Sequence, residues 1–193
     1  RFNLDRHEPL FDFGCGYGKT IYALNALGFS NVRGCDFSEN QIQIAKILRI
    51  DNITHSSIIE SLGACDDESL ANAIFFDVLE HLADDEVVHI FSELQRVLTP
   101  SGRIIIRVPN GASPFSGALL YGDLTHYRSY TDDSLEQFAQ LHGLTVDAFF
   151  EDSPIPISVF GFLRYVVWRI LRLVYVLITA VETGELNVRR IYT

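Results

Sequence analysis

Cysteine is scarce in this chain of 193 residues, and methionine is absent. The cysteines Cys15, Cys35 and Cys65 are odd in number and form no CxxC pair, so we predict neither a disulfide framework nor a zinc or other metal site. We expect reduced thiols in a cytoplasmic protein, without an N-terminal signal peptide. Two explanations stay open for the missing methionine: the chain begins inside a longer natural protein, or methionines are missing from the sequence as printed.

Basic residues are also in short supply, with 15 Lys and Arg against 25 Asp and Glu and a formal net charge of −10. An acidic chain is poorly suited to gripping a phosphate backbone, so nucleic acid is not expected as a partner. The charge is uneven, because residues 155–193 hold five Arg and two Glu while residues 1–154 are strongly acidic. We therefore expect the C-terminal segment to face a different environment from the rest.

Long uncharged runs are missing too. Residues 157–181 are strongly apolar and predict a helix, but the uncharged run 173–181 has only nine residues where a membrane span needs about 20. Arg164, Arg169 and Arg172 fall within one arc of about 140° at 100° per residue. Three interpretations stay open: a helix packed on its own domain or in a homodimer, a peripheral helix on an anionic membrane surface, and a true span.

Apolar residues are plentiful at 48%, which is enough for the core of one domain. Strand and helix patterns alternate along the chain, and this alternation implies a parallel sheet with helices on both faces. Ser38 and Gln41 are spaced as a capping box at the start of the second helix. In residues 109–131 the apolar residues show neither helix nor strand periodicity, and we predict a long functional loop there. The expected strands are 9–13, 31–35, 52–55, 73–79, 103–108 and 144–150, and the expected helices are 19–27, 38–48, 84–98 and 132–142.

A glycine-rich turn, Gly14-Cys15-Gly16-Tyr17-Gly18, follows the first strand, and Asp36 closes the second. Glycines let a ligand approach the backbone closely at the carboxyl edge of a parallel sheet. A carboxylate on the next strand can accept both hydroxyls of a ribose. The pair therefore predicts a nucleotide-like ligand, and the GxGxG spacing differs from the GxGxxG of dinucleotide-binding domains, which argues against an NAD-dependent oxidoreductase.

These blocks resemble the class I S-adenosylmethionine (SAM)-dependent methyltransferases. Besides the glycine turn, the resemblance rests on residues 77–82 (DVLEHL) and 94–106 (LQRVLTPSGRIII), and it covers most of residues 8–150. It implies an α/β, Rossmann-like, mostly parallel sheet of seven strands with an antiparallel last strand. Residues 1–193 would form a single domain, with 151–186 a helical, apolar and basic insertion before the last strand, at about 187–192. A helix usually precedes the first strand of this family, so we also expect the natural chain to extend before Arg1.

The resemblance assigns the cofactor site to residues that follow the first, second and fourth strands. Asp12 and the glycine turn are expected to face the methionine part of SAM, Asp36 to hold the ribose, and Phe37 to lie along the adenine. His55 and Ser56 occupy the region near the adenine edge, but the usual acidic residue is missing there. The cofactor-binding residues expected from the family are Asp12, Gly14, Cys15, Gly16, Gly18, Asp36, Phe37 and Asp77.

Methyl transfer to an alcohol also needs a base, and histidine suits this role with an unperturbed pKa near 6.5. His81 follows the fourth strand, and His126 lies in the 109–131 loop. Residues 123–131 (DLTHYRSYT) resemble the D-x-x-H-x-R-x-[YF]-[ST] segment of bacterial methyltransferases that modify glycans and small molecules. We therefore predict His126 and His81 as catalytic candidates. Tyr127, Arg128 and Tyr130 are the candidates for substrate binding, and the alternative role for Arg128 is a salt bridge to Asp123 or Asp132.

The leading hypothesis is a cytoplasmic SAM-dependent O-methyltransferase (class EC 2.1.1) that releases S-adenosylhomocysteine, and a location at the inner membrane surface stays open. Its expected acceptor is a sugar hydroxyl in a polysaccharide or lipid-linked glycan pathway. One alternative is a lipophilic, quinone-type small molecule, because residues 77–82 also resemble ubiquinone-pathway O-methyltransferases. A second alternative is a non-catalytic, SAM-binding partner subunit that uses 157–181 as its interaction surface.

Overall fold

The computed structural model describes residues 4–151 and 153–184. The chain divides into two compact units, each described by itself. Of the described residues, the first unit contains 4–108 together with Gln137–Thr145, and the second contains Pro109–Glu136, 146–151 and 153–184. That they form a single domain stays a prediction.

A sheet of five parallel strands forms the centre of the first unit, in the order β3-β2-β1-β4-β5. The central strands β1 and β4 are buried along most of their lengths, as expected for a parallel sheet covered on both faces. Phe13 of β1 stacks on Phe75 of β4 with ring centroids 5.0 Å apart and anchors the core. The strands are β1 (Leu10–Phe13), β2 (Val32–Asp36), β3 (Ile53–His55), β4 (Leu70–Phe76) and β5 (Leu98–Arg107).

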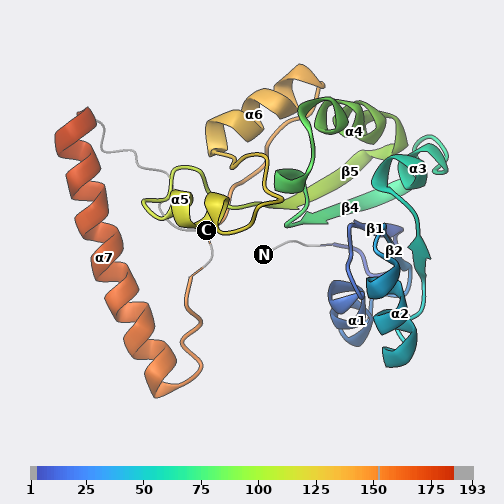
Figure 1. Ribbon diagram of the computed structural model, residues 1–193, viewed down its shortest axis with the longest axis horizontal. Coiled ribbons are helices and arrows are strands. Elements are labelled where there is room, and N and C mark those ends of the chain that lie inside the picture. Colours follow the sequence, from blue (N-terminus) through green and yellow to red (C-terminus); the bar gives the residue numbers. More distant parts are fainter. Residues whose placement is uncertain (1–3, 152, 185–193) are drawn as a thin grey trace. The chain divides into compact units, whose positions relative to one another are not determined.

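Four helices cover this sheet, two on each face (Figure 1). Right-handed crossovers explain the division, since the chain moves outward from β1 to β3 in one direction and from β4 to β5 in the other. On one face lie α1 (Lys19–Ala26) and α2 (Glu39–Leu48), and on the other lie α3 (Ile58–Gly63) and α4 (Asp84–Val97). A short 3₁₀ turn, η1 (Leu79–His81), follows β4.

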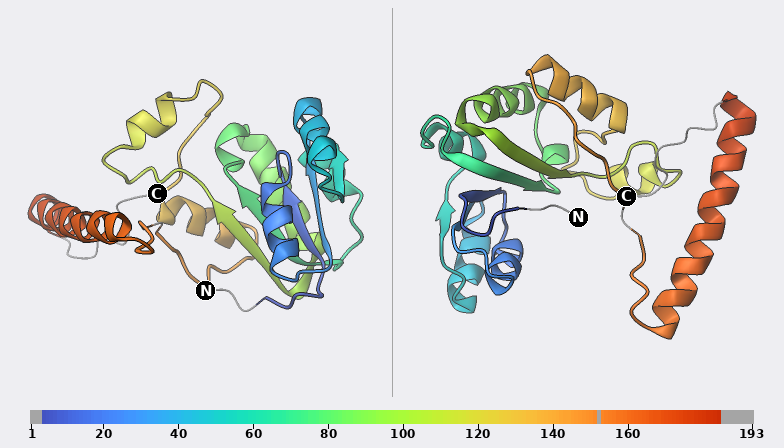
Figure 2. Two further views of the ribbon diagram at one scale, coloured as in Figure 1. Left: turned by 90° about the horizontal axis from the view of Figure 1, so that it is seen from below. Right: turned by 180° about the vertical axis from the view of Figure 1, so that it is seen from behind.

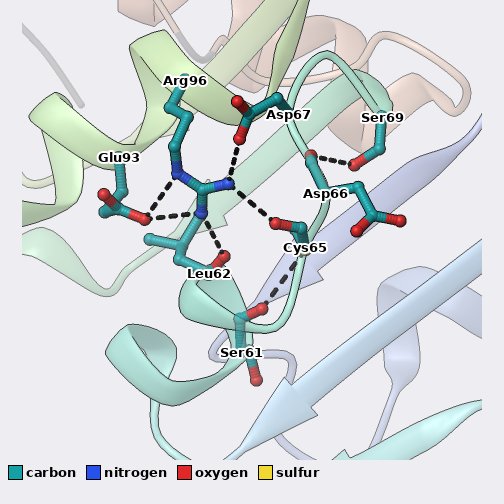
Figure 3. A network of polar contacts seen from close by, with 8 residues as sticks. All are labelled: Ser61, Leu62, Cys65, Asp66, Asp67, Ser69, Glu93 and Arg96. Carbon is teal, nitrogen blue, oxygen red and sulfur yellow. Dashed lines mark hydrogen bonds and ion pairs between the residues drawn. The ribbon is translucent and has the colours of Figure 1, made fainter.

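Arg96 of α4 ties that helix to the end of α3 (Figure 3). Its Nη atoms donate to the carbonyl oxygens of Leu62 and Cys65, 3.0 and 2.9 Å away, and so satisfy carbonyls at the helix end. The guanidinium also donates to the carboxylates of Asp67 and Glu93 at 2.7 Å each. These acidic partners raise the pKa of Arg96 above its ordinary value.

Several sequence predictions need correction here. Five strands, all parallel, are present among the described residues, instead of seven with an antiparallel last strand. Residues 144–150 do not form the predicted strand and lie outside the five strands of the sheet. The backbone N–H of Leu144 donates to the Ala139 carbonyl of α6 at 2.8 Å, so the segment begins at a helix end and not in a strand ladder. The predicted strand at 187–192 lies outside the described residues. Ser38 is the N-cap of α2, but its side chain makes no capping bond, so the predicted box with Gln41 does not form.

The loop at 109–131 belongs to the second unit and is more ordered than its composition predicts. It contains α5 (Ser116–Tyr121), and its two ends meet in a bridge between Asn110 and Tyr130. The helix α6 (Asp132–Leu141) follows and continues into the first unit, where Phe138 contacts Phe91 of α4 with ring centroids 5.8 Å apart. The last described helix is α7 (Val159–Thr183).

Candidate functional site

The glycine turn and the end of β2 meet at the carboxyl edge of the sheet. Asp12 lies beside Gly34 in the parallel register of β1 and β2, and Phe13 lies beside Cys35. The carbonyl of Cys35 accepts hydrogen bonds from the backbone N–H groups of Gly14 and Cys15, both at 2.9 Å. The turn is thereby fastened to the strand that ends in Asp36, as the sequence predicts.

The glycines of this turn are required by its backbone. Gly14, Gly16 and Gly18 all have positive φ, the region that side chains disfavour. A Cβ at Gly14 would lie 2.6 Å from Cγ2 of Val78, and a Cβ at Gly18 would collide with Ile53. At Gly16 a Cβ would meet only the Gln41 side chain, 3.7 Å away. The turn therefore leaves room above Gly16 for a ligand to approach the backbone.

Asp36 is 8% exposed and both of its carboxylate oxygens are engaged by the backbone. Oδ2 accepts from the N–H of Gly16 at 2.8 Å, and Oδ1 accepts from the N–H of Ser38 at 2.9 Å. A carboxylate has about four lone-pair sites, so each oxygen can still accept a hydroxyl. Asp36 can therefore hold two vicinal hydroxyls of a ribose while it holds the turn.

Asp12 is 1% exposed, and its Oδ2 has no hydrogen-bond partner among the described residues. Burial raises the pKa of Asp12 to about 7, and the negative charge of Asp36 acts in the same direction. The charge of Arg107 and a hydrogen bond from Thr20 oppose this rise in pKa. A buried carboxyl with an unsatisfied oxygen is suited to a cationic ligand group, which would favour its ionised form.

Cys15 lies inside the turn but is not set up as a nucleophile. Burial raises the pKa of its thiol well above the ordinary value, and the carboxylates of Asp12 and Asp36 raise it further. The thiol is therefore protonated at neutral pH, and the reactive species of a cysteine is the thiolate. Cys15 contributes a small, neutral wall to the site.

Asp77 and Arg107 form an ion pair at the ends of β4 and β5. The carboxylate of Asp77 accepts from Nε of Arg107 at 3.0 Å and from its Nη2, and the backbone N–H of Asp77 donates to the Arg107 carbonyl at 2.9 Å. Asp77 has a φ of +55°, an uncommon value that tertiary contacts must hold. The sequence predicts Asp77 but misses Arg107, although Arg107 lies near the end of the predicted strand 103–108 and so on the same edge of the sheet.

The remaining predicted residues of the first unit differ in their exposure and contacts. Phe37 follows β2 with 80% of its side chain exposed, which leaves its ring free to lie along a ligand. The ring of His55 donates from Nε2 to the Phe37 carbonyl at 2.9 Å, and the hydroxyl of Ser56 contacts that of Ser61. His55 and Ser56 therefore tie the ends of β2, β3 and α3 together. His81 ends η1 and is partly exposed.

The second unit holds the other catalytic candidate. Nδ1 of His126 lies 3.0 Å from the Leu119 carbonyl, which can only accept, so Nδ1 carries the proton and the lone pair of the neutral ring is on Nε2. Asp123 shapes this segment, because its Oδ1 accepts from the N–H of Thr125 at 2.9 Å. This is the tautomer that a general base needs at Nε2.

The predicted substrate residues of the same loop differ in exposure. Tyr127 is 70% exposed, whereas Tyr130 is only 2% exposed. Arg128 lies over the Tyr130 ring, 5.9 Å from its centroid. Tyr127 and Arg128 therefore have the geometry of a contact surface, and Tyr130 contributes to packing beneath it. That any of the three touches an acceptor stays a prediction.

Comparison with known proteins finds one matching family model. The family model described as a methyltransferase domain matches residues 11–106, which include β1 to β5 almost completely. The comparison with curated proteins finds no match.

Solved structures show the same fold. One is a SAM-dependent methyltransferase from Archaeoglobus fulgidus, with TM-score 0.67, 21% identity, and coverage of 84% of this chain and 79% of that one. A second, from Mesorhizobium loti, has TM-score 0.61 and 19% identity over 79% and 82% of the two chains. A third is the 1,6-didemethyltoxoflavin-N1-methyltransferase of Burkholderia thailandensis, solved with S-adenosylhomocysteine. It has TM-score 0.59 and 19% identity, and the match covers 75% of this chain and 64% of that one.

The residues at the sheet edge fit SAM as the cofactor. The glycine turn offers an open backbone, Asp36 offers acceptor sites for the ribose, and the unsatisfied Oδ2 of Asp12 suits the positively charged methionine part. The prediction of this cofactor is thus supported by the comparisons and by the geometry of the site.

Proposed function

We propose that this chain is a SAM-dependent methyltransferase whose acceptor is a sugar hydroxyl of a polysaccharide or lipid-linked glycan; residues 11–106 match the family model described as a methyltransferase domain. The observation that supports an alcohol acceptor is the tautomer of His126, whose Nδ1 donates to the Leu119 carbonyl. A hydroxyl nucleophile must lose its proton, and Nε2 of this ring is the acceptor for it.

The proposed mechanism gives separate roles to the residues that orient the cofactor and to the residue that accepts the proton. When bound, SAM supplies a methyl group that is displaced in line from its sulfonium sulfur. Asp36 and the glycine turn orient the ribose and the methionine part, and this orientation supplies much of the rate. Nε2 of His126 takes the proton of the acceptor hydroxyl while the oxygen of that hydroxyl bonds to the methyl carbon. Arg128 binds an anionic group of the acceptor, such as the phosphate of a lipid-linked or nucleotide sugar.

The proposal is tested by assaying S-adenosylhomocysteine formation with nucleotide sugars, lipid-linked sugars and quinone-type phenols. We expect turnover with the sugars, reduced about 10²–10⁴-fold by His126→Ala without a loss of cofactor affinity. His89→Ala is the matched control, because His89 is exposed on α4. Turnover with the phenols alone would favour the quinone-type acceptor.

The other catalytic candidate is separated by the same assay. If His81→Ala abolishes turnover and His126→Ala does not, the base is His81. If neither substitution changes turnover, the base assignment is wrong. A chain that binds cofactor but turns over no acceptor would fit the non-catalytic partner subunit.

A further inference from the structure

The helix α7 carries the largest exposed apolar surface among the described residues. Thirteen large apolar side chains of α7 are exposed, and Leu163, Ile170 and Leu177 are each more than half exposed. Monomeric proteins rarely leave an apolar stripe of this length uncovered. None of the described helices is long and apolar enough to cross a membrane, α7 included.

The helix is built as a defined, rigid element. Ser158 is its N-cap and accepts from the N–H of Gly161 at 3.0 Å, and Gly184 closes it with a φ of +75°. Figure 2 shows it as one uninterrupted helix. Its apolar surface therefore belongs to a formed helix and is not a consequence of local unfolding.

One face of α7 is turned toward the rest of the second unit. Nε of Arg172 donates to the carboxylate of Glu151 at 3.0 Å, and Glu151 is only 10% exposed. Tyr165 and Trp168 stack on the same side, with ring centroids 6.1 Å apart. The ion pair with Glu151 turns this arc of α7 toward the segment that precedes the helix, whereas the Tyr165–Trp168 stack lies within α7.

The charges of α7 border its apolar face on both sides. At 100° per residue, Arg164 and Arg169 stand about 140° apart with Arg172 between them. All thirteen exposed apolar side chains fall in the remaining arc of about 220°, which contains no charged residue. Arginine side chains at the borders of an apolar face can reach outward to headgroups while that face enters the acyl region.

We propose that α7 docks this apolar face, with Arg164 and Arg169 at its edges, onto the surface of an anionic lipid bilayer. The charge pattern favours lipid over a second copy of the chain. Two copies that paired through this face would bring the arginine borders of one helix against those of the other. Glu182 is the only acidic residue of α7, so it could not neutralise the arginines of two facing helices. A bilayer with anionic headgroups offers the opposite charge along both borders.

The test is flotation of the full chain with vesicles of phosphatidylcholine alone and of phosphatidylcholine with phosphatidylglycerol. We expect binding only with phosphatidylglycerol, weakening as salt is added. Each basic residue near an anionic surface changes partitioning about fivefold, so the double variant R164Q/R169Q should bind about 30-fold more weakly. The double variant I170D/L177D should not bind, and because both side chains are exposed it should keep its fold by circular dichroism.

The matched control is R33Q/R103Q, which removes the same charge from exposed positions in β2 and β5. It should bind as the wild type does. Equal binding of the control and R164Q/R169Q would overturn the role of the α7 arginines. A protein that ignores both vesicle types would overturn the proposal. Light scattering then decides whether a dimer sensitive to I170D/L177D covers the face instead.

Discussion

Asp36 and Gly16 are joined by a hydrogen bond of 2.8 Å from the glycine N–H to Oδ2 of the carboxylate. The residue expected to hold the ribose is therefore also the residue that holds the glycine turn in place. One side chain at the end of β2 therefore has both roles, binding the ligand and fixing the loop geometry.

Replacing Asp36 by alanine should weaken S-adenosylhomocysteine binding at least tenfold in a calorimetric titration. Hydrogen bonds that involve a charged group are worth about 1.5–3 kcal/mol each, and the variant also frees the turn. Asp36→Asn keeps one acceptor oxygen and should lie between alanine and wild type. Asp51→Ala, at an exposed position, is the control. Unchanged binding in Asp36→Ala would show that the ribose is held elsewhere.

Asp12 should make the stability of the fold depend on pH. Its pKa rises from 3.8 to about 7 on folding, so its protonation stabilises the folded protein below pH 3.8, and that stabilisation is lost as the pH rises through 7. A pKa difference of this size corresponds to about 4 kcal/mol. We expect Asp12→Asn to gain stability relative to wild type between pH 4 and pH 8 in urea unfolding. Asp51→Asn should show no such trend. If the stability of Asp12→Asn and of the wild type changed with pH in parallel, the raised pKa of Asp12 would be contradicted.

The same carboxyl should couple cofactor binding to a proton. A cationic ligand beside Asp12 favours its ionised form, so SAM binding should release a proton and tighten by up to tenfold per pH unit below about pH 7. S-adenosylhomocysteine lacks the sulfonium charge and should depend less steeply on pH. Calorimetry in buffers of different ionisation enthalpy counts the protons. If the affinities for SAM and S-adenosylhomocysteine changed equally with pH, Asp12 would not respond to the sulfonium charge.

Gly18→Ala should destabilise the first unit. Gly18 has a φ of +87°, and a Cβ there would collide with Ile53 and lie 2.9 Å from Cγ2 of Ile50. Backbone strain of this kind costs about 1–3 kcal/mol, which should lower the thermal midpoint by several degrees. Gly63→Ala is a sharp control, because nothing lies within 4 Å of its Cβ position. It should leave the midpoint unchanged or raise it, and an equal fall in both variants would refute the steric argument.

Much of this structure is predictable from the sequence, because it rests on local patterns. Alternating apolar strands and amphipathic helices indicate a parallel α/β sheet, and each of its five strands overlaps a segment predicted as a strand. The glycine turn and Asp36 are readable because the spacing of a βαβ unit brings the ends of adjacent strands together. The helix α7 follows from its apolar content and its single arc of arginines.

Other features depend on which groups come together in space, and no local pattern carries that information. The strand predicted at 144–150 is absent from the sheet, because an apolar pattern does not determine which strand a segment will lie beside. Arg107 joins Asp77 only because β4 and β5 are neighbours, and the pKa of Asp12 rises because the surrounding elements bury it beside Asp36. The sequence by itself determined the periodicity of the elements and the chemistry at their ends. The tertiary structure alone decided burial, pairing and ionisation, since each depends on distances between residues far apart in the chain.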